Sequence, residues 1–225
     1  MREASIAFQP AEFDVERDSV AVGGQLVTIR GRAATYPDLF LPLYGAHQAQ
    51  NAAVAVAAVE AFLGGGEEPL RGPLLEEAFA TVTSPGRLQL VGTDPTIVVD
   101  AAHNPHGARS LARALDEVFD FDEWGLVFGA LGDKDVAGIV AELAPAVARV
   151  FVTPLPSERA ADVQELAALA RAVGRETSVH ADLFDATTAA REWAAESERR
   201  AVVVAGSVVL AGEAIGLAED ERWKP

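Results

Sequence analysis

Short apolar runs alternate with amphipathic stretches from residue 84 to the carboxyl end of the chain. The runs have the length of buried strands, and the stretches between them repeat apolar residues at the spacing of one helix face. The expected strands are Leu88–Val91, Thr96–Asp100, Gly125–Gly129, Arg149–Thr153, Thr177–His180 and Ala201–Ala205, and the expected helices are Gly107–Phe119, Val136–Leu143, Ala161–Val173 and Ala186–Glu198. This alternation predicts parallel βαβ units, and hence an open, mostly parallel, Rossmann-like α/β sheet flanked by helices.

The first 83 residues follow a different pattern. The segment SVAVGGQLVTIRG alternates around Gly23-Gly24, as two strands joined by a hairpin turn do. The stretch 46–63 is rich in Ala and Val without a helix breaker, so it is expected to form a buried, close-packed helix, and 70–82 a second short one. Because Ser84-Pro85-Gly86 interrupts the pattern, we expect a domain boundary there, between residues 1–83 and 84–225.

Composition narrows the class of protein. Half of the 225 residues are hydrophobic and 23% are charged, which is enough to bury a core. The absence of cysteine excludes a disulfide framework, a thiolate zinc site and a cysteine nucleophile. A net charge of −16 disfavours nucleic-acid and anionic-membrane partners. Since the chain opens on Met-Arg-Glu and its longest apolar run is too short to span a bilayer, we expect a cytoplasmic protein.

Polar clusters follow three of the expected strands: TIVVD runs into AAHNPHG, GLVFGAL into GDKD, and AVVVA into GSV. Ligands of open α/β sheets bind at the carboxyl ends of the strands. At such an end the Asp100 carboxylate can accept both hydroxyls of a ribose, and hydrogen bonds within a turn or cap are the alternative. His103 and His106 follow in a loop in which Pro105 holds Asn104 extended. A metal site of Asp100 and the two histidines is disfavoured, because their spacing lacks the i, i+4 geometry of a preformed site.

Five other residues are candidates for ligand binding. Arg87, at the expected boundary, can reach a phosphate bidentately, although a surface arginine is the ordinary alternative. His47 and Asn51 share one face of the first helix, where an asparagine amide can pair with a base edge. Lys134 lies in GDKD, whose aspartates are suited to helix capping. Ser207 follows a strand end, where the backbone can bind an anion or the hydroxyl can simply cap a helix.

The segments LPLYGAHQAQNAAVAVAAVEAF, TSPGRLQLV, TIVVDAAHNPHGA, VFGALGDKD and VVVAGSVVLAGE together resemble the folylpolyglutamate synthase/dihydrofolate synthase family of the Mur ligase superfamily, in that family's order and spacing. The resemblance implies a Mur ligase carboxyl-terminal domain preceded by the end of the central ATPase domain. Family members carry their GTNGKT-type P-loop, folate site, magnesium ligands and modified lysine in an amino-terminal part that this sequence does not match. No GxxxxGK[ST] motif occurs in the chain.

The resemblance also implies roles for individual residues. Asn51 corresponds to the asparagine at the adenine, Arg87 to the hinge arginine directed at the terminal phosphates, and Asp100 to the aspartate on the ribose. His103 and Ser207 correspond to positions that line the incoming glutamate. His47 and Lys134 remain possible additions to the site.

The implied reaction uses ATP and Mg²⁺ to phosphorylate a folate or dihydropteroate carboxylate, which L-glutamate then attacks. The chain alone is expected to be inactive, and the intact enzyme is expected to be a monomer. Two alternatives stay open: a stand-alone, non-catalytic nucleotide- or partner-binding domain, and a Mur ligase that acts on a peptidoglycan precursor. The choice between dihydrofolate synthase and folylpolyglutamate synthase activity depends on the folate site, which none of the matched motifs contains.

Overall fold

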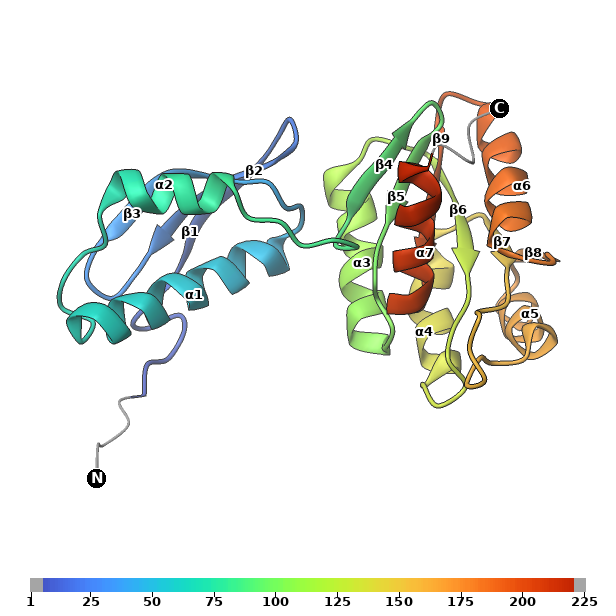
Figure 1. Cartoon of the computed structure of the whole chain (residues 1–225), viewed down its shortest axis with the longest axis horizontal. Helices are drawn as coiled ribbons and strands as arrows, with labels where there is room; N and C mark the ends of the chain where they lie inside the picture. Colours follow the sequence, from blue (N-terminus) through green and yellow to red (C-terminus); the bar gives the residue numbers. More distant parts are fainter. Residues whose placement is uncertain (1–5, 221–225) are drawn as a thin grey trace. The chain divides into compact units, whose positions relative to one another are not determined.

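The structure is a computed structural model that describes residues 6–220. The chain divides into two compact units, Met1–Ser84 and Pro85–Pro225, which are described separately (Figure 1). Within the described residues no helix is both long and apolar enough to cross a membrane.

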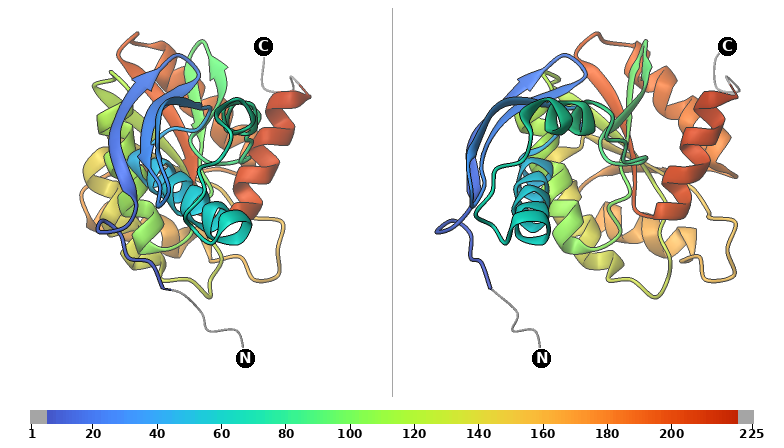
Figure 2. Two further views of the ribbon diagram at one scale, coloured as in Figure 1. Left: turned by 90° about the vertical axis from the view of Figure 1, so that its left-hand side faces the viewer. Right: turned by 60° about the vertical axis from the view of Figure 1, so that its left-hand side comes forward.

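The first unit is a small antiparallel sheet packed on two helices. The sheet consists of β1 (Asp14–Ala21), β2 (Gly24–Arg30) and β3 (Thr35–Leu41) in sequential order, and the hairpin expected at Gly23-Gly24 joins the first two. Figure 2 shows the sheet curving beside α1 (Ala46–Gly64), with α2 (Gly72–Ala80) next to it. The core between these elements is formed by Phe13, Val27, Ile29, Tyr36, Leu39, Leu41, Ala49, Ala53, Val56, Ala57, Leu75 and Phe79.

Helix α1 was expected to be a buried, close-packed helix, and it is buried on one side only. One face, with Ala49, Ala53 and Val56, packs on the sheet. The opposite face is exposed in the described structure, and it includes Asn51 and Phe62. The expectation was wrong for that half, because an Ala- and Val-rich sequence shows which residues tolerate burial but not whether the chain itself supplies a covering element.

The second unit is a six-stranded sheet of order β4-β5-β9-β6-β7-β8. Its strands are β4 (Gln89–Thr93), β5 (Thr96–Val99), β6 (Glu123–Phe128), β7 (Arg149–Val152), β8 (Glu176–Val179) and β9 (Arg200–Ala205). Only the β4–β5 pairing is antiparallel, and the pairs from β5 to β8 are parallel. The predicted open, mostly parallel α/β sheet is confirmed.

The last strand, β9, lies inside the sheet. It pairs with β5 through Val98–Val203 and with β6 through Val127–Val204. Residues 201–205 are all buried, as expected for a parallel strand covered on both faces. Strands β5 and β6 therefore do not pair with each other, because β9 lies between them and pairs with both.

Helices cover both faces of this sheet. Helices α6 (Leu183–Ala195) and α7 (Val208–Glu219) share one apolar core with Val127, Phe151 and Val204. Helices α3 (Pro105–Val118), α4 (Val136–Leu143) and α5 (Val163–Ala172) pack along the other face, where Leu126 and Val150 meet α4 and α5. A single 3-10 turn (Ala144–Ala146) follows α4.

The bounds of helices α3, α5 and α6 differ from the sequence-based ones by up to three residues. Helix α6 starts at Leu183 rather than at Ala186, because Asp182 caps it by accepting the N–H of Asp185 at 2.9 Å. Helix α7 was expected only as a helix start that Ser207 could cap, without bounds, since the apolar run on both sides of Gly206-Ser207 has no clear period.

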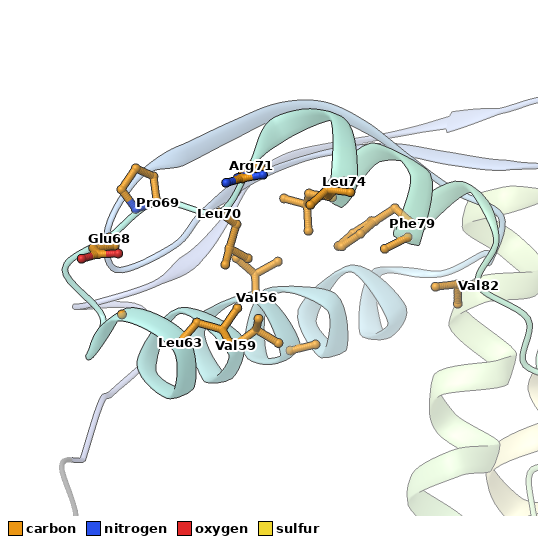
Figure 3. A pocket seen from close by; sticks show the side chains of 14 residues that line it. Val56, Val59, Leu63, Glu68, Pro69, Leu70, Arg71, Leu74, Phe79 and Val82 are labelled. Carbon is orange, nitrogen blue, oxygen red and sulfur yellow. The ribbon is translucent and has the colours of Figure 1, made fainter.

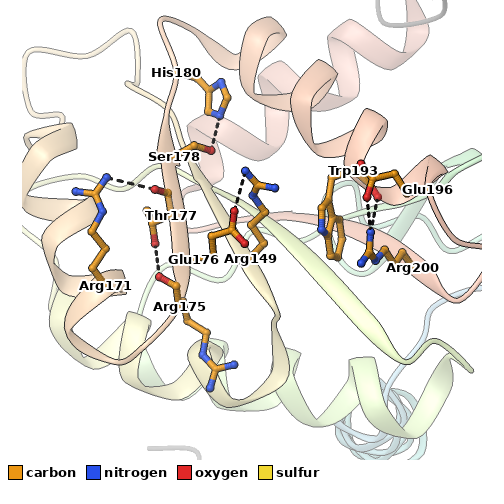
Figure 4. A network of polar contacts seen from close by, with 10 residues as sticks. All are labelled: Arg149, Arg171, Arg175, Glu176, Thr177, Ser178, His180, Trp193, Glu196 and Arg200. Atoms are coloured by element: carbon orange, nitrogen blue, oxygen red, sulfur yellow. Dashed lines mark hydrogen bonds and ion pairs between the residues drawn. The ribbon is translucent and has the colours of Figure 1, made fainter.

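The free edge strand β8 carries polar and charged side chains that suit a solvent-facing edge (Figure 4). Glu176 pairs with Arg149 of the neighbouring strand at 3.1 Å, and Ser178 Oγ lies 2.8 Å from His180 Nε2. Burial lowers the pKa of His180, the nearby Asp185 opposes this shift, and Arg149 adds to it. The polar side chains of the edge strand β8 therefore interact with other residues of the second unit.

Candidate functional site

The turn that carries Arg87 is fixed to the end of strand β5. Gly86 donates its N–H to Gln89 Oε1 at 2.9 Å, and its carbonyl accepts the N–H of Ala101 at 2.7 Å. Leu88 is buried and has a φ of 45°, a conformation that costs energy for a residue with a side chain. Arg87 itself is exposed, between two anchored neighbours.

Asp100 is the residue that holds this turn. Its Oδ2 accepts the N–H of Leu88 at 3.0 Å and its Oδ1 accepts the N–H of Ala102 at 2.8 Å. The residue is 5% exposed. Burial raises the pKa of Asp100, and the two backbone hydrogen bonds and the charges of Arg87 and His103 oppose the rise. The geometry therefore shows the alternative raised from the sequence, in which Asp100 forms hydrogen bonds to the backbone of a turn. A ribose could bind only to the lone pairs of the Asp100 carboxylate that these hydrogen bonds leave.

His103 lies just beyond the strand end with its ring oriented by the backbone. Its Nδ1 is 2.9 Å from the carbonyl oxygen of Ala101. Because a carbonyl only accepts, Nδ1 carries the proton, and in the neutral ring Nε2 is left as an acceptor. Asn104 is extended, as expected before Pro105, and caps α3 by accepting the N–H of Gly107 at 2.8 Å. His106 is exposed in the first turn of α3.

Gly206 and Ser207 form the tight connection between β9 and α7. Gly206 has a φ of 123° and donates its N–H to the carbonyl of Ala102 at 3.0 Å, which joins this turn to the Asp100 loop. A Cβ at this position would lie 2.6 Å from the carbonyl oxygen of Gly129. Ser207 is buried, and its Oγ accepts the N–H of Val209 at 3.1 Å, so its helix-capping role is the one the structure shows.

Lys134 lies in the loop after the neighbouring strand β6. The loop is a tight turn in which Lys134 donates its N–H to Leu131 and accepts the N–H of Val136. Asp135 caps α4 as expected, by accepting the N–H of Gly138 at 2.9 Å. The expectation that Asp133 also caps is wrong, since its carboxylate pairs with Arg159 instead. The backbone hydrogen bonds of Lys134 join it to Leu131 and Val136 of its own loop and not to Asp100 or His103.

Asn51 and His47 belong to the first unit, in the first two turns of α1. Asn51 is exposed, and its amide donates to Gln48 Oε1 at 3.3 Å. His47 is half-buried. Asn51 keeps its acceptor oxygen available to a ligand, which suits the edge of a base.

Gln89 is the residue of the site that sequence reasoning missed. Its side chain supports the Pro85-Gly86 turn from three residues away. A polar side chain shortly after a Pro-Gly turn is the signal that could have identified it.

The edge thus combines an exposed cation, an oriented imidazole and the amino-terminal ends of α3, α4 and α7, since each helix follows a strand of the parallel sheet. Such an arrangement suits a ligand with negative charge. Among the described residues no group of three His, Asp or Glu side chains could hold a metal ion.

Comparisons with known proteins identify relatives of this chain. Residues 86–208 match the family described as Mur ligase, glutamate ligase domain. The chain is 43% identical to the dihydrofolate synthase/folylpolyglutamate synthase of Mycobacterium tuberculosis, over 94% of this chain and 46% of that protein. The structure of M. tuberculosis folylpolyglutamate synthase complexed with ADP matches with a TM-score of 0.88 at 43% identity, over 93% of this chain and 48% of that one.

An Escherichia coli relative, solved in complex with DHPP and ADP, matches with a TM-score of 0.78 at 26% identity, over 95% of this chain and 47% of that one. The chain spans about half the length of these relatives. The resemblance inferred from the five motifs is confirmed, and the matched segment 86–208 makes up more than half of the 225 residues. The chain therefore belongs to the Mur ligase family and contains its glutamate ligase domain.

Proposed function

We propose that this chain supplies the carboxyl-terminal half of an ATP-dependent ligase that joins L-glutamate to the carboxylate of a folate or dihydropteroate. The observation that carries the proposal is the exposed Arg87, anchored on both sides to the strand end that also orients His103. The relative with 43% identity is a dihydrofolate synthase/folylpolyglutamate synthase, and its solved counterpart is complexed with ADP. These names favour folate over a peptidoglycan precursor.

In the proposed reaction the carboxylate of the acceptor attacks the γ-phosphorus of ATP, and ADP leaves. The glutamate ammonium first loses a proton, and the neutral amine attacks the acyl phosphate carbon. A C–N bond forms, inorganic phosphate leaves with the C–O electron pair, and the amide nitrogen releases a second proton to solvent. The chain's contribution is to position the reactants and to stabilise charge.

Arg87 is the proposed catalytic residue. A guanidinium can donate two parallel hydrogen bonds to phosphate oxygens without losing its charge. Its neighbours Gly86 and Leu88 are both hydrogen-bonded to the strand-end region, so the side chain projects from a rigid base. Negative charge that develops on the transferring phosphoryl group would be stabilised there.

The remaining candidates divide by ligand. We assign Asn51 to the adenine and the Asp100 region to the ribose, with Asp100 acting chiefly through the backbone that it holds. His103 and the turn at Ser207 are assigned to the glutamate. The Nε2 of neutral His103 can accept a hydrogen bond from the glutamate ammonium, while Ser207 positions the first turn of α7. Lys134 and His47 are assigned no step.

The described residues do not provide a metal site, so no step is assigned to a metal held by this chain. Mg²⁺ bound elsewhere in the ligase would neutralise charge on the ATP phosphates. The sequence contains no GxxxxGK[ST] loop, so the β- and γ-phosphates need a second, phosphate-binding half. We propose that the assembled ligase acts as a monomer in the cytoplasm.

A chimera tests the proposal. This chain would replace the matched 46% of the M. tuberculosis synthase, and product would be measured with ATP, Mg²⁺, L-glutamate and either dihydropteroate or a reduced folate. Glutamylated product is expected from the chimera and none from this chain alone. A folded chimera that binds ATP but forms no product with either acceptor would reject the function.

A further inference from the structure

A groove of about 520 Å³ lies on the second unit, between helices α6 and α7 and the loop after β7. This α6–α7 groove is lined by residues 154–156 of that loop, by residues 182–184 at the start of α6, and by Glu213, Gly216 and Leu217 of α7. None of the residues assigned to the ligase reaction is among them. The volume is within the range of sites that bind small molecules.

The walls and the floor of the α6–α7 groove are mostly apolar. Leu155 and Leu183 are buried and belong to the core beneath it. The ring of Phe184 is 45% exposed at the start of α6. At Gly216 a Cβ atom would meet nothing within 4 Å in the described structure, so the α7 wall is open at this position. The groove can therefore hold the apolar body of a ligand.

Two carboxylates, Asp182 and Glu213, interrupt this apolar lining. Asp182 uses Oδ1 to accept the N–H of Asp185 at 2.9 Å, which caps α6. Glu213 is half-buried, and among the described residues no hydrogen bond or ion pair satisfies it. Burial raises the pKa of Glu213, and no neighbouring charge of the described chain opposes the rise. A half-buried carboxylate without a partner is stabilised by a cation that binds beside it.

The charge of the α6–α7 groove differs from that of a groove in the first unit. The groove of the first unit, about 510 Å³ between α1 and α2, is lined by one acidic and one basic residue, Glu68 and Arg71, besides its apolar side chains (Figure 3). The α6–α7 groove has no lysine or arginine in its lining. Because its charged side chains are of one sign, they favour a positively charged ligand.

We propose that the α6–α7 groove is a binding site for a small organic cation, whose protonated amine pairs with Glu213 and whose aromatic or aliphatic body packs on Phe184 and Leu217. The ring of Phe184 can also form a cation–π contact with the amine. The groove is a site separate from that of the ligase reaction, and the inference does not rest on the proposed function.

Size and charge select a small molecule as the occupant. Nine residues line the groove, whereas a protein partner engages roughly 20–30 residues on each side of an interface. The net charge of −16 attracts cations over a longer range and repels anions. An amine with an apolar body therefore satisfies both the carboxylates and the apolar walls.

Calorimetric titration of the full chain tests the site, with phenethylamine as the probe and phenethyl alcohol as its neutral counterpart. The Kd of the amine is expected to be at least about tenfold lower than that of the alcohol, because only the amine forms a charge-assisted hydrogen bond with a carboxylate. Hydrocinnamate, which has a similar apolar body but a negative charge, should not bind.

Three substitutions locate the site. Glu213→Gln should remove the preference for the amine, so that the amine and the alcohol bind alike. Glu219→Gln removes the same charge from an exposed position of the same helix and should leave the preference unchanged. Gly216→Leu should fill the groove and abolish the binding of both probes, while leaving the circular dichroism spectrum unchanged.

Equal affinity of the wild type for the amine and the alcohol would overturn the proposal, as would the absence of amine binding. Equal losses in Glu213→Gln and Glu219→Gln would assign binding to the net charge of the chain and reject the groove. Undiminished binding by a folded Gly216→Leu variant would also reject it. If the wild type forms a dimer that Phe184→Asp dissociates, the occupant is a second copy and the proposal is wrong.

Discussion

Asp100 accepts the backbone N–H of Leu88 at 3.0 Å, which ties the end of β5 to the residue that follows Arg87. Leu88 is held in the left-handed region of backbone conformation by this contact and by its own burial. The Asp100 carboxylate therefore contributes to the proposed catalysis by fixing the position of the turn that carries Arg87. A nucleotide contact would be additional to that role.

Asp100→Asn is expected to destabilise the second unit. An amide offers one acceptor oxygen where two backbone N–H groups need acceptors, so about 1–3 kcal/mol of unfolding free energy should be lost. Urea unfolding measures the loss. Asp116→Asn, on the exposed side of α3, is the control and should stay within about 0.5 kcal/mol. Equal effects of the two substitutions would contradict a structural role for Asp100.

The same pair of proteins should show a defined pH dependence. Because burial raises the pKa of Asp100 above its ordinary value of 3.8, the folded state binds this proton more tightly than the unfolded state does. Its contribution to stability is complete below 3.8 and is lost as the pH rises through the raised value. The stability advantage of wild type over Asp100→Asn should therefore shrink as the pH rises across that window. An advantage that grows instead would mean that the backbone hydrogen bonds outweigh the burial.

Arg87→Ala in the chimera should lower kcat by about 100-fold or more, since the side chain is proposed to stabilise charge only in the transition state. The Kd for ATP should change by less than about threefold, because Arg87 is proposed to stabilise the transition state and not the bound ATP of the ground state. Arg113→Ala removes an exposed arginine paired with Glu117 on α3 and should leave both constants unchanged. Equal losses of ATP affinity and turnover would assign Arg87 to ground-state binding.

Gly206→Ala should destabilise the second unit by about 2 kcal/mol or more, through a steric clash combined with a strained φ. The new Cβ would lie 2.6 Å from the Gly129 carbonyl oxygen and 2.6 Å from a ring atom of Phe128. Gly212→Ala is the matched control in α7, where nothing lies within 4 Å, and it should stabilise by up to about 1 kcal/mol. Urea unfolding of both variants checks the pair, and a tolerated alanine at 206 would show that the turn can shift.

Glu60→Gln should destabilise the first unit by about 2–4 kcal/mol. The substitution replaces one of the two buried carboxylate oxygens by an amide NH₂ group, so hydrogen-bond donors that face it lose their acceptor. The fully buried carboxylate accepts the N–H of Arg32 at 2.6 Å and the hydroxyl of Tyr36 at 2.7 Å. Tyr36→Phe removes one donor to Glu60 and also the acceptor of the Leu70 N–H, and it should cost about 1–2 kcal/mol. Thermal unfolding ranks the two variants, and a larger loss for Tyr36→Phe would contradict this account.

Short strand-like runs bounded by turn residues are sufficient to predict all six strands of the second unit, and the runs that form β5, β6, β7 and β9 are mostly buried. Apolar spacing fails at α7, where Val208, Val209 and Leu210 continue the apolar character of β9 and only Ser207 marks a helix start. The site shows the same limit. The position of Asp100 at a strand end follows from the pattern, but its bond to Leu88 joins residues twelve apart and depends on an antiparallel pairing that the local sequence does not specify.

The insertion of β9 between β5 and β6 has a consequence for biosynthesis. Strands β5 and β6 emerge from the ribosome before β9, yet they do not pair with each other, and both must wait for residues 200–205. The centre of the sheet can close only after these residues have been translated. Until then two apolar strand edges stay open, so a nascent chain stalled before residue 200 should need chaperone protection that the finished unit does not.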